Sequence, residues 1–84
     1  MKTLVLYTRE GCCLCDEARK VLDQVHGRNP RAFVWQERDI DSDDRLHLAY
    51  LERIPVVTID GEEAFELFLD ESELQQRLGI VGAG

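Results

Sequence analysis

The three cysteines of the 84-residue chain lie within four consecutive positions, at Cys12, Cys13 and Cys15. A secreted domain held by disulfides spreads an even number of cysteines along its sequence so that distant loops can be joined. This chain does not follow that pattern, so its fold is expected to depend on a hydrophobic core. Thiols clustered in this way indicate redox chemistry or metal binding.

The length suits one domain with one core, and we expect residues 1–84 to form it, with a flexible tail from about residue 81. A content of 44% hydrophobic and 32% charged residues is typical of a folded, soluble protein. A net charge of −7 without a basic stripe argues against nucleic acid and against anionic membranes as partners. The apolar run 4–7 is too short for a signal peptide or a membrane span, which predicts a cytoplasmic protein. We also expect the protein to be a monomer.

Apolar periodicity predicts seven elements. Residues 2–8 are almost continuously apolar, as in a strand buried on both faces. From Leu14 to Val25 the apolar residues recur every three or four positions, which indicates a helix. Asp60-Gly61 is a strong hairpin signal. The predicted elements are a strand 2–8, a helix from 14 that is stopped by Gly27 and then Asn29-Pro30, a strand 32–40, a short helix with a broad apolar face over 46–51, strands 55–59 and 64–69, and a helix between the cap Asp70, in a D-x-x-E pattern with Glu73, and Gly79.

This order predicts an α/β fold. A strand–helix–strand unit needs parallel pairing with a right-handed crossover, and the hairpin adds an antiparallel edge. In the strand 32–40, Phe33 and Trp35 share one face and Val34 lies on the other. The expected architecture is a four-stranded mixed sheet with three helices on its two faces, in the order β-α-β-α-β-β-α.

Cys12 and Cys15 form a C-x-x-C motif where the first strand leads into the first helix. Residues three apart on a helix lie about 5–6 Å apart, which a disulfide can span. Free N–H groups and the dipole at a helix N-terminus favour a thiolate, so Cys12 is the predicted nucleophile. Cys15, one turn further and more buried, is the predicted resolving cysteine, and Arg9 adds positive charge nearby.

Two alternatives remain open beside redox catalysis. Three thiolates could hold Cu(I) or part of an iron–sulfur cluster, although zinc prefers four ligands and the chain has no second C-x-x-C. His26 is expected to cap the far end of the first helix and His47 to lie in a solvated stretch, so no metal ligand or cofactor is predicted. The other alternative is a non-catalytic interaction domain on the same scaffold.

The run YTREGCCLCDEA, residues 7–18, resembles the glutaredoxins, in which a strand ending in Tyr-Thr and a basic residue precede Cys-Pro-Tyr-Cys. The element order is also theirs, within the thioredoxin fold. The segment RIPVV, residues 53–57, is similar to their Thr-Val-Pro segment, whose proline is cis and faces the disulfide. The resemblance implies that Pro55 is cis and that the backbone of Ile54 pairs with the substrate.

The chain also departs from that family. Cys13 and Leu14 replace Pro-Tyr, which alters the surface beside the nucleophile and leaves Cys13 as an exposed thiol open to side reactions. The Gly-Gly-Asp segment that binds the γ-glutamyl end of glutathione is missing, and residues 69–73 read LDESE instead. Of the nearby residues, only Arg9 and Arg53 supply cations.

These observations predict a thiol–disulfide oxidoreductase acting on a protein or small-molecule disulfide. The predicted substrate-binding residues are Arg9, Cys13, Leu14, Ile54 and Pro55. Because acids would repel the carboxylates of glutathione, we expect glutathione to be a poor electron donor and a dithiol reductase to be a better one. The alternative is that Asp70 or Ser72 performs the role of the missing segment.

Overall fold

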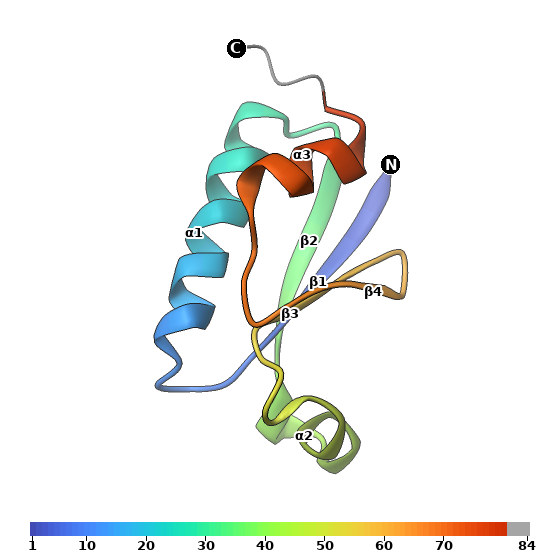
Figure 1. Cartoon of the computed structure of the whole chain (residues 1–84). Helices are drawn as coiled ribbons and strands as arrows, with labels where there is room; N and C mark the ends of the chain where they lie inside the picture. Colours follow the sequence, from blue (N-terminus) through green and yellow to red (C-terminus); the bar gives the residue numbers. More distant parts are fainter. Residues whose placement is uncertain (81–84) are drawn as a thin grey trace.

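Strand β1 (Lys2–Thr8) lies inside a four-stranded sheet in the computed structural model, which describes residues 1–80 (Figure 1). The strand order is β2-β1-β3-β4. β2 (Phe33–Asp39) runs parallel to β1, and β3 (Val56–Ile59) and β4 (Glu62–Glu66) add two antiparallel pairings. The predicted mixed sheet is therefore confirmed, whereas the flexible tail predicted from residue 81 lies outside the described residues.

The core lies between one face of this sheet and two helices, α1 (Cys13–Arg28) and α3 (Glu71–Leu78). Alternation along β1 turns Leu4 and Leu6 toward the helices, and both are fully buried. On β2 the same face carries Phe33, as the sequence predicts. The buried cluster consists of Leu4, Leu6, Ala18, Leu22, Val25, Phe33, Val57, Phe65, Leu69, Leu74 and Leu78.

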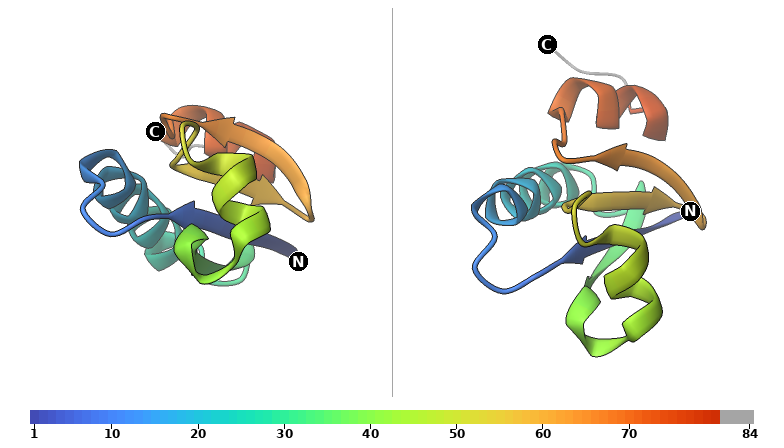
Figure 2. Two further views of the ribbon diagram at one scale, coloured as in Figure 1. Left: turned by 90° about the horizontal axis from the view of Figure 1, so that it is seen from below. Right: turned by 60° about the horizontal axis from the view of Figure 1, so that its bottom comes forward.

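Helix α2 (Asp44–Tyr50) lies on the other side of the sheet, beyond its end (Figure 2). It contacts the sheet through the ring of Tyr50, whose centroid is 4.8 Å from that of Tyr7 on β1. The predicted short helix is present, but its broad apolar face is not buried in the core, because the helix has no fully buried residue and Leu48 is 85% exposed. None of the helices within residues 1–80 has the length and apolar character needed to cross a membrane.

Helix α1 continues through Gly27, the first of the predicted stop residues, and ends at the second, Asn29. The backbone N–H of Asn29 donates to the carbonyl oxygens of Val25 (3.0 Å) and His26 (3.1 Å). The Asn29 amide donates to the Val25 oxygen as well, at 3.2 Å. His26, expected to cap this end, lies in the last turn and packs its ring edge-on against Phe33.

Strand β2 is one residue shorter at each end than the predicted 32–40. Ala32 donates its N–H to the turn oxygen of Asn29. Ile40 leaves the strand to begin a 3₁₀ helix, η1 (Ile40–Ser42), in which its side chain is fully buried.

Strand β4 lies earlier in the sequence than the predicted 64–69. Asp60 and Gly61 both have positive φ angles (52° and 89°), as in a two-residue hairpin turn, so pairing resumes directly at Glu62. The strand ends at Glu66.

The strand ends there because Leu67 turns the chain back across the start of β3. It has a φ of 66° and donates its N–H to the carbonyl oxygens of Arg53 (3.1 Å) and Pro55 (2.9 Å). Phe68 is left 69% exposed, while Leu69 re-enters the core. These hydrogen bonds hold the segment before α3 against the segment before β3.

Candidate functional site

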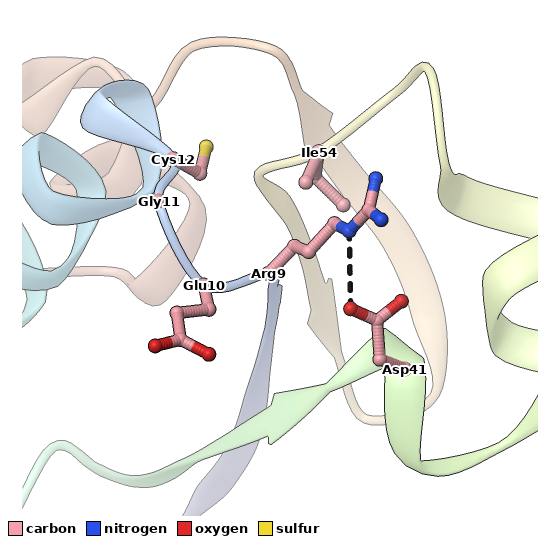
Figure 3. Close-up of a pocket in the computed structure, with 6 residues that line it drawn as sticks. All are labelled: Arg9, Glu10, Gly11, Cys12, Asp41 and Ile54. Atoms are coloured by element: carbon pink, nitrogen blue, oxygen red, sulfur yellow. Dashed lines mark hydrogen bonds and ion pairs between the residues drawn. The ribbon is translucent and has the colours of Figure 1, made fainter.

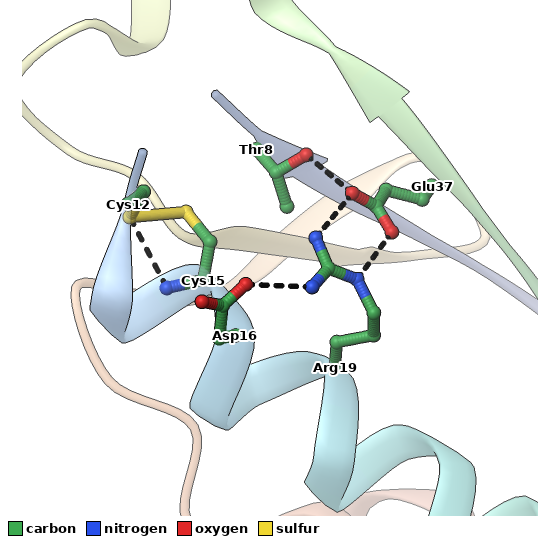
Figure 4. Close-up of a disulfide and its surroundings, with 6 residues drawn as sticks. All are labelled: Thr8, Cys12, Cys15, Asp16, Arg19 and Glu37. Atoms are coloured by element: carbon green, nitrogen blue, oxygen red, sulfur yellow. Dashed lines mark hydrogen bonds and ion pairs between the residues drawn. A yellow bond between two sulfur atoms is a disulfide. The ribbon is translucent and has the colours of Figure 1, made fainter. Parts of the chain in front are cut away.

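The C-x-x-C pair stands at the start of α1, where the sequence predicts it. Cys12 is the N-cap residue, in an extended conformation, and Cys15 is in the first turn. The two are joined by a disulfide, with Cα atoms 5.2 Å apart (Figure 4). The backbone N–H of Cys15 donates to Cys12 Sγ at 3.1 Å, so a free helix N–H is directed at that sulfur.

The two cysteines differ in their access to solvent. Cys15 is fully buried against the core, whereas Cys12 is half-buried and lines a surface pocket. This asymmetry agrees with the expectation that Cys15 is the more buried of the pair. A partner molecule can therefore reach Cys12 far more easily than Cys15.

The pocket beside Cys12 is open and has a volume of about 470 Å³ (Figure 3). Ile54 forms its far wall, and the predicted cis peptide bond between Ile54 and Pro55 is present. Pro55 is buried behind this wall, and Leu14 and Cys13 lie exposed on the first turn of α1. The residues that line the pocket are Arg9, Glu10, Gly11, Cys12, Asp41 and Ile54.

The backbone of Ile54, expected to pair with a substrate, is partly used by the fold. Its N–H donates to the carbonyl oxygen of Tyr50 at 3.1 Å. The N–H of Ile54 is thus already bonded within the protein.

Arg9 reaches the pocket, but it is not a free cation. Its Nε donates to Asp41 Oδ2 at 3.0 Å, and Figure 3 shows the two side chains meeting at the pocket's edge. The other oxygen of Asp41 lies 3.5 Å from His47 Nε2. Arg9 therefore brings its positive charge to the pocket beside Cys12, as expected from the sequence, together with the balancing negative charge of Asp41.

Arg53, the other expected cation, lies apart from the pocket lining. Its guanidinium bonds to Glu63 and Glu66 of β4 and lies over the Tyr50 ring at 5.4 Å from the centroid. These contacts turn it toward the β4 edge of the sheet, and the carboxylates hold its pKa well above the ordinary value. Burial raises the pKa of the Tyr50 hydroxyl, with the nearby Glu63 as a further cause.

A second polar cluster joins α1 to the sheet near the disulfide (Figure 4). Arg19 donates two hydrogen bonds of 2.7 Å to Glu37 and a third to Asp16. The buried Thr8 hydroxyl donates to Glu37 at 2.8 Å. The bonds from Arg19, and to a lesser extent that from Thr8, hold the pKa of the Glu37 carboxyl below its usual range.

Sequence reasoning did not identify Glu37 or Asp41. A signal exists for Glu37, since alternation along β2 places it on the same face as Phe33 and Trp35, where a carboxylate needs a partner. For Asp41 the signal is topological. Thr8 and Asp39 pair in adjacent parallel strands, so the residues that follow those strands come together.

The two residues that precede the segment 69–73, which stands in place of Gly-Gly-Asp, are apolar and exposed. Leu67 is 48% exposed and Phe68 69% exposed. Asp70 is occupied as the N-cap of α3, where its Oδ1 accepts from the N–H of Ser72 at 3.1 Å. The D-x-x-E pattern gives this bond, and the predicted Gly79 C-cap is confirmed with a φ of 72°.

Within residues 1–80, no three side chains of His, Cys, Asp and Glu converge in a group that could hold a metal ion.

The sequence matches a family model described as glutaredoxin-like domain (DUF836) over residues 3–79. No curated protein sequence matches the chain.

Two bacterial structures of similar length superpose well. The solution structure of a Nitrosomonas europaea protein has a TM-score of 0.75 at 29% identity, covering 90% of this chain and 89% of that one. The X-ray structure of a protein from X. campestris has a TM-score of 0.71 at 35% identity, covering 93% and 97%. A thioredoxin mutant from Halobacterium salinarum, 21% identical, has a TM-score of 0.68 and covers 92% of this chain and 71% of that one, which shows the thioredoxin fold.

Proposed function

This chain belongs to the glutaredoxin-like domain family, and from that premise we propose that it is a thiol–disulfide oxidoreductase. Cys12 is the attacking residue and Cys15 the resolving one. The observation that carries the proposal is the asymmetry of the pair. One sulfur lies at a helix N-terminus in an open pocket, and the other is fully buried at bonding distance behind it.

The exchange proceeds in two steps. In the first, the Cys12 thiolate attacks one sulfur of the substrate disulfide, a Cys12–substrate disulfide forms, and the other substrate sulfur leaves and takes up a proton. In the second, Cys15 loses its proton and attacks Cys12 Sγ, so that the Cys12–Cys15 bond forms and the second substrate thiol is released. The substrate gains the two electrons that the protein dithiol gives up.

Three parts of the site support the first step. The helix N-terminus and the N–H of Cys15 favour negative charge on Cys12. The carbonyl oxygen of Ile54 offers a backbone acceptor to a peptide substrate across the pocket. Leu14, exposed on the first turn of α1, adds apolar contact beside the sulfur.

The reductant that restores the dithiol is, in this proposal, a dithiol protein in the cytoplasm. Glutathione needs donors for two carboxylates and an acid for its ammonium. Here Arg9 is paired with Asp41, Asp70 caps α3, and Leu67 and Phe68 are apolar. A dithiol donor needs no such pocket, because a second thiol resolves the mixed disulfide.

Trapping the mixed disulfide tests the assignment. The Cys13→Ser variant keeps the pair and serves as the reference, with Cys15→Ser or Cys12→Ser added to it. Each reduced protein is mixed with hydroxyethyl disulfide and its mass is measured. We expect the variant lacking Cys15 to retain one mercaptoethanol adduct on Cys12, and the reference to form the Cys12–Cys15 disulfide without an adduct. Equal adduct formation on Cys15 in the variant lacking Cys12 would contradict the assignment.

A further inference from the structure

We propose that Asp41 is a specificity-determining residue, which makes the pocket beside Cys12 discriminate against disulfides that carry a carboxylate close to the sulfurs. It does so by pairing with Arg9. The inference rests on the proposed exchange function and names the substrate class of that same site, which is neutral or cationic disulfides.

The Arg9–Asp41 pair occupies the place where a charged substrate group would bind. Both residues line the pocket with Cys12, and their side chains are 45% and 40% exposed. The pair therefore faces the solvent that a substrate displaces. Arg9 gives its Nε to Asp41, and a carboxylate that approaches the remaining guanidinium nitrogens also approaches the Asp41 carboxylate.

No other residue of the pocket lining offers a substrate carboxylate a free positive charge. Glu10 is the remaining charged residue of the lining, and its side chain points away from Arg9 (Figure 3). Arg53 is held by two glutamates of β4, and Arg19 by Glu37 and Asp16. A carboxylate in the pocket thus meets no uncompensated cation among the lining residues.

The pair is fixed by topology. Arg9 follows β1 directly, and Asp41 lies two residues after the end of β2. Because Thr8 and Asp39 are paired in the parallel register, the two chain segments leave the sheet side by side. The backbone N–H of Asp41 donates to Asp39 Oδ1 at 2.8 Å, which holds the turn whatever side chain stands at position 41.

The test compares oxidation of the reduced protein by three disulfides. Hydroxyethyl disulfide is uncharged, dithiodipropionate has a carboxylate at each end, and cystamine has an amine at each end. Formation of the Cys12–Cys15 bond is followed in a single turnover by acid quenching and thiol alkylation, with two thiols released per disulfide consumed. The readout is the rate with each charged disulfide divided by the rate with the neutral one.

The variants are Asp41→Asn, Asp44→Asn, Arg9→Gln and the double variant Arg9→Gln/Asp41→Asn. Asp44 is an exposed residue of α2 outside the pocket, so its change removes the same unit of net charge without freeing Arg9. We expect Asp41→Asn to raise the dithiodipropionate ratio about fivefold, the upper range for one exposed ion pair, and to lower the cystamine ratio. The Asp44→Asn ratios should equal those of the unmodified protein, and the gain should vanish in the double variant.

Three results would overturn the inference: an unchanged ratio in Asp41→Asn, the same gain in Asp44→Asn, or a gain that persists without Arg9. Circular dichroism shows whether Asp41→Asn keeps the folded structure. Should the fold be lost, Asp41→Ser takes its place with the same expected ratios, and an unchanged dithiodipropionate ratio in that variant would overturn the inference. If hydroxyethyl disulfide itself fails to oxidise the pair, the exchange function is wrong, whatever the ratios.

Discussion

Cys12 and Cys13 are neighbours whose expected reactivity is opposite to their exposure. Cys13 is the exposed free thiol, whereas Cys12 is half-buried at the helix N-terminus with the Cys15 N–H directed at its sulfur. We predict that limiting iodoacetamide at mildly acid pH alkylates Cys12 of the reduced protein before Cys13, because the thiolate is the reacting form. Peptide mass spectrometry measures the order. Faster labelling of Cys13 or Cys15 would show that the roles are misassigned.

Glu37 links acid stability to the arrangement of α1 on the sheet. Its pKa is lowered in the folded state, chiefly by the bonds from Arg19, so its stabilising effect is present above the unfolded value of 4.5 and is lost as the pH falls through the folded value. We predict that Glu37→Gln lowers the free energy of unfolding at neutral pH by about 1 kcal/mol or less, because the pair is one-third exposed (34%). In acid, the difference in the free energy of unfolding between Glu37→Gln and the unmodified protein should disappear.

Urea unfolding at neutral and acid pH measures this gap. Glu62→Gln is the control, since Glu62 is an exposed residue at the start of β4. A gap for Glu37→Gln that is the same at both pH values would contradict the stated role of the carboxylate.

At the scale of elements, α3 depends on one capping side chain. Asp70 accepts from the backbone N–H of Ser72, and this bond satisfies one of the free donors of the first turn. We predict that Asp70→Ala lowers the free energy of unfolding by about 1 kcal/mol. Ser72→Ala keeps the backbone donor and should cost much less. Equal losses for the two variants in thermal or urea unfolding would exclude the capping bond as the cause.

Elements with strong local signals were predicted well. β1 is almost continuously apolar and has its predicted bounds, although only one face is fully buried, since Val5 and Tyr7 on the other are half-buried. Asp70 and Gly79 bound α3 as expected. The signals for α2 and β4 were incomplete. Leu48 belongs to an apolar pattern, but whether that pattern is buried depends on where the helix lies relative to the sheet. β4 ends at Leu67 because of bonds to the distant Arg53 and Pro55, which no local pattern encodes.

The residues of the site also fall into those that local sequence signals predict and those that depend on distant contacts. Cys12 and Cys15 could be placed from spacing, because their separation on a helix is a local property. The cis bond before Pro55 came from resemblance. Asp41 could not be found without the register of β1 and β2, since it lies 32 positions from Arg9 in sequence.

For the molecule as a whole, stability depends on one layer of apolar packing between α1, α3 and the sheet. Leu74 on α3 is fully buried, whereas Leu48 on α2 is 85% exposed. We predict that Leu74→Ala lowers the free energy of unfolding by about 2–5 kcal/mol, a large part of the total for a small domain. Leu48→Ala should change it by less than about 0.5 kcal/mol. Similar losses in urea unfolding would contradict this description of the core.

The central claim is that the Cys12–Cys15 pair is a catalytic dithiol and not a structural crosslink. Its reduction potential, measured by equilibration with a dithiothreitol redox buffer and mass analysis, tests this most directly. We predict a value between about −120 and −270 mV, the range of proteins that exchange disulfides, and the same value in Cys13→Ser. A value below about −300 mV, typical of structural disulfides, would contradict the account.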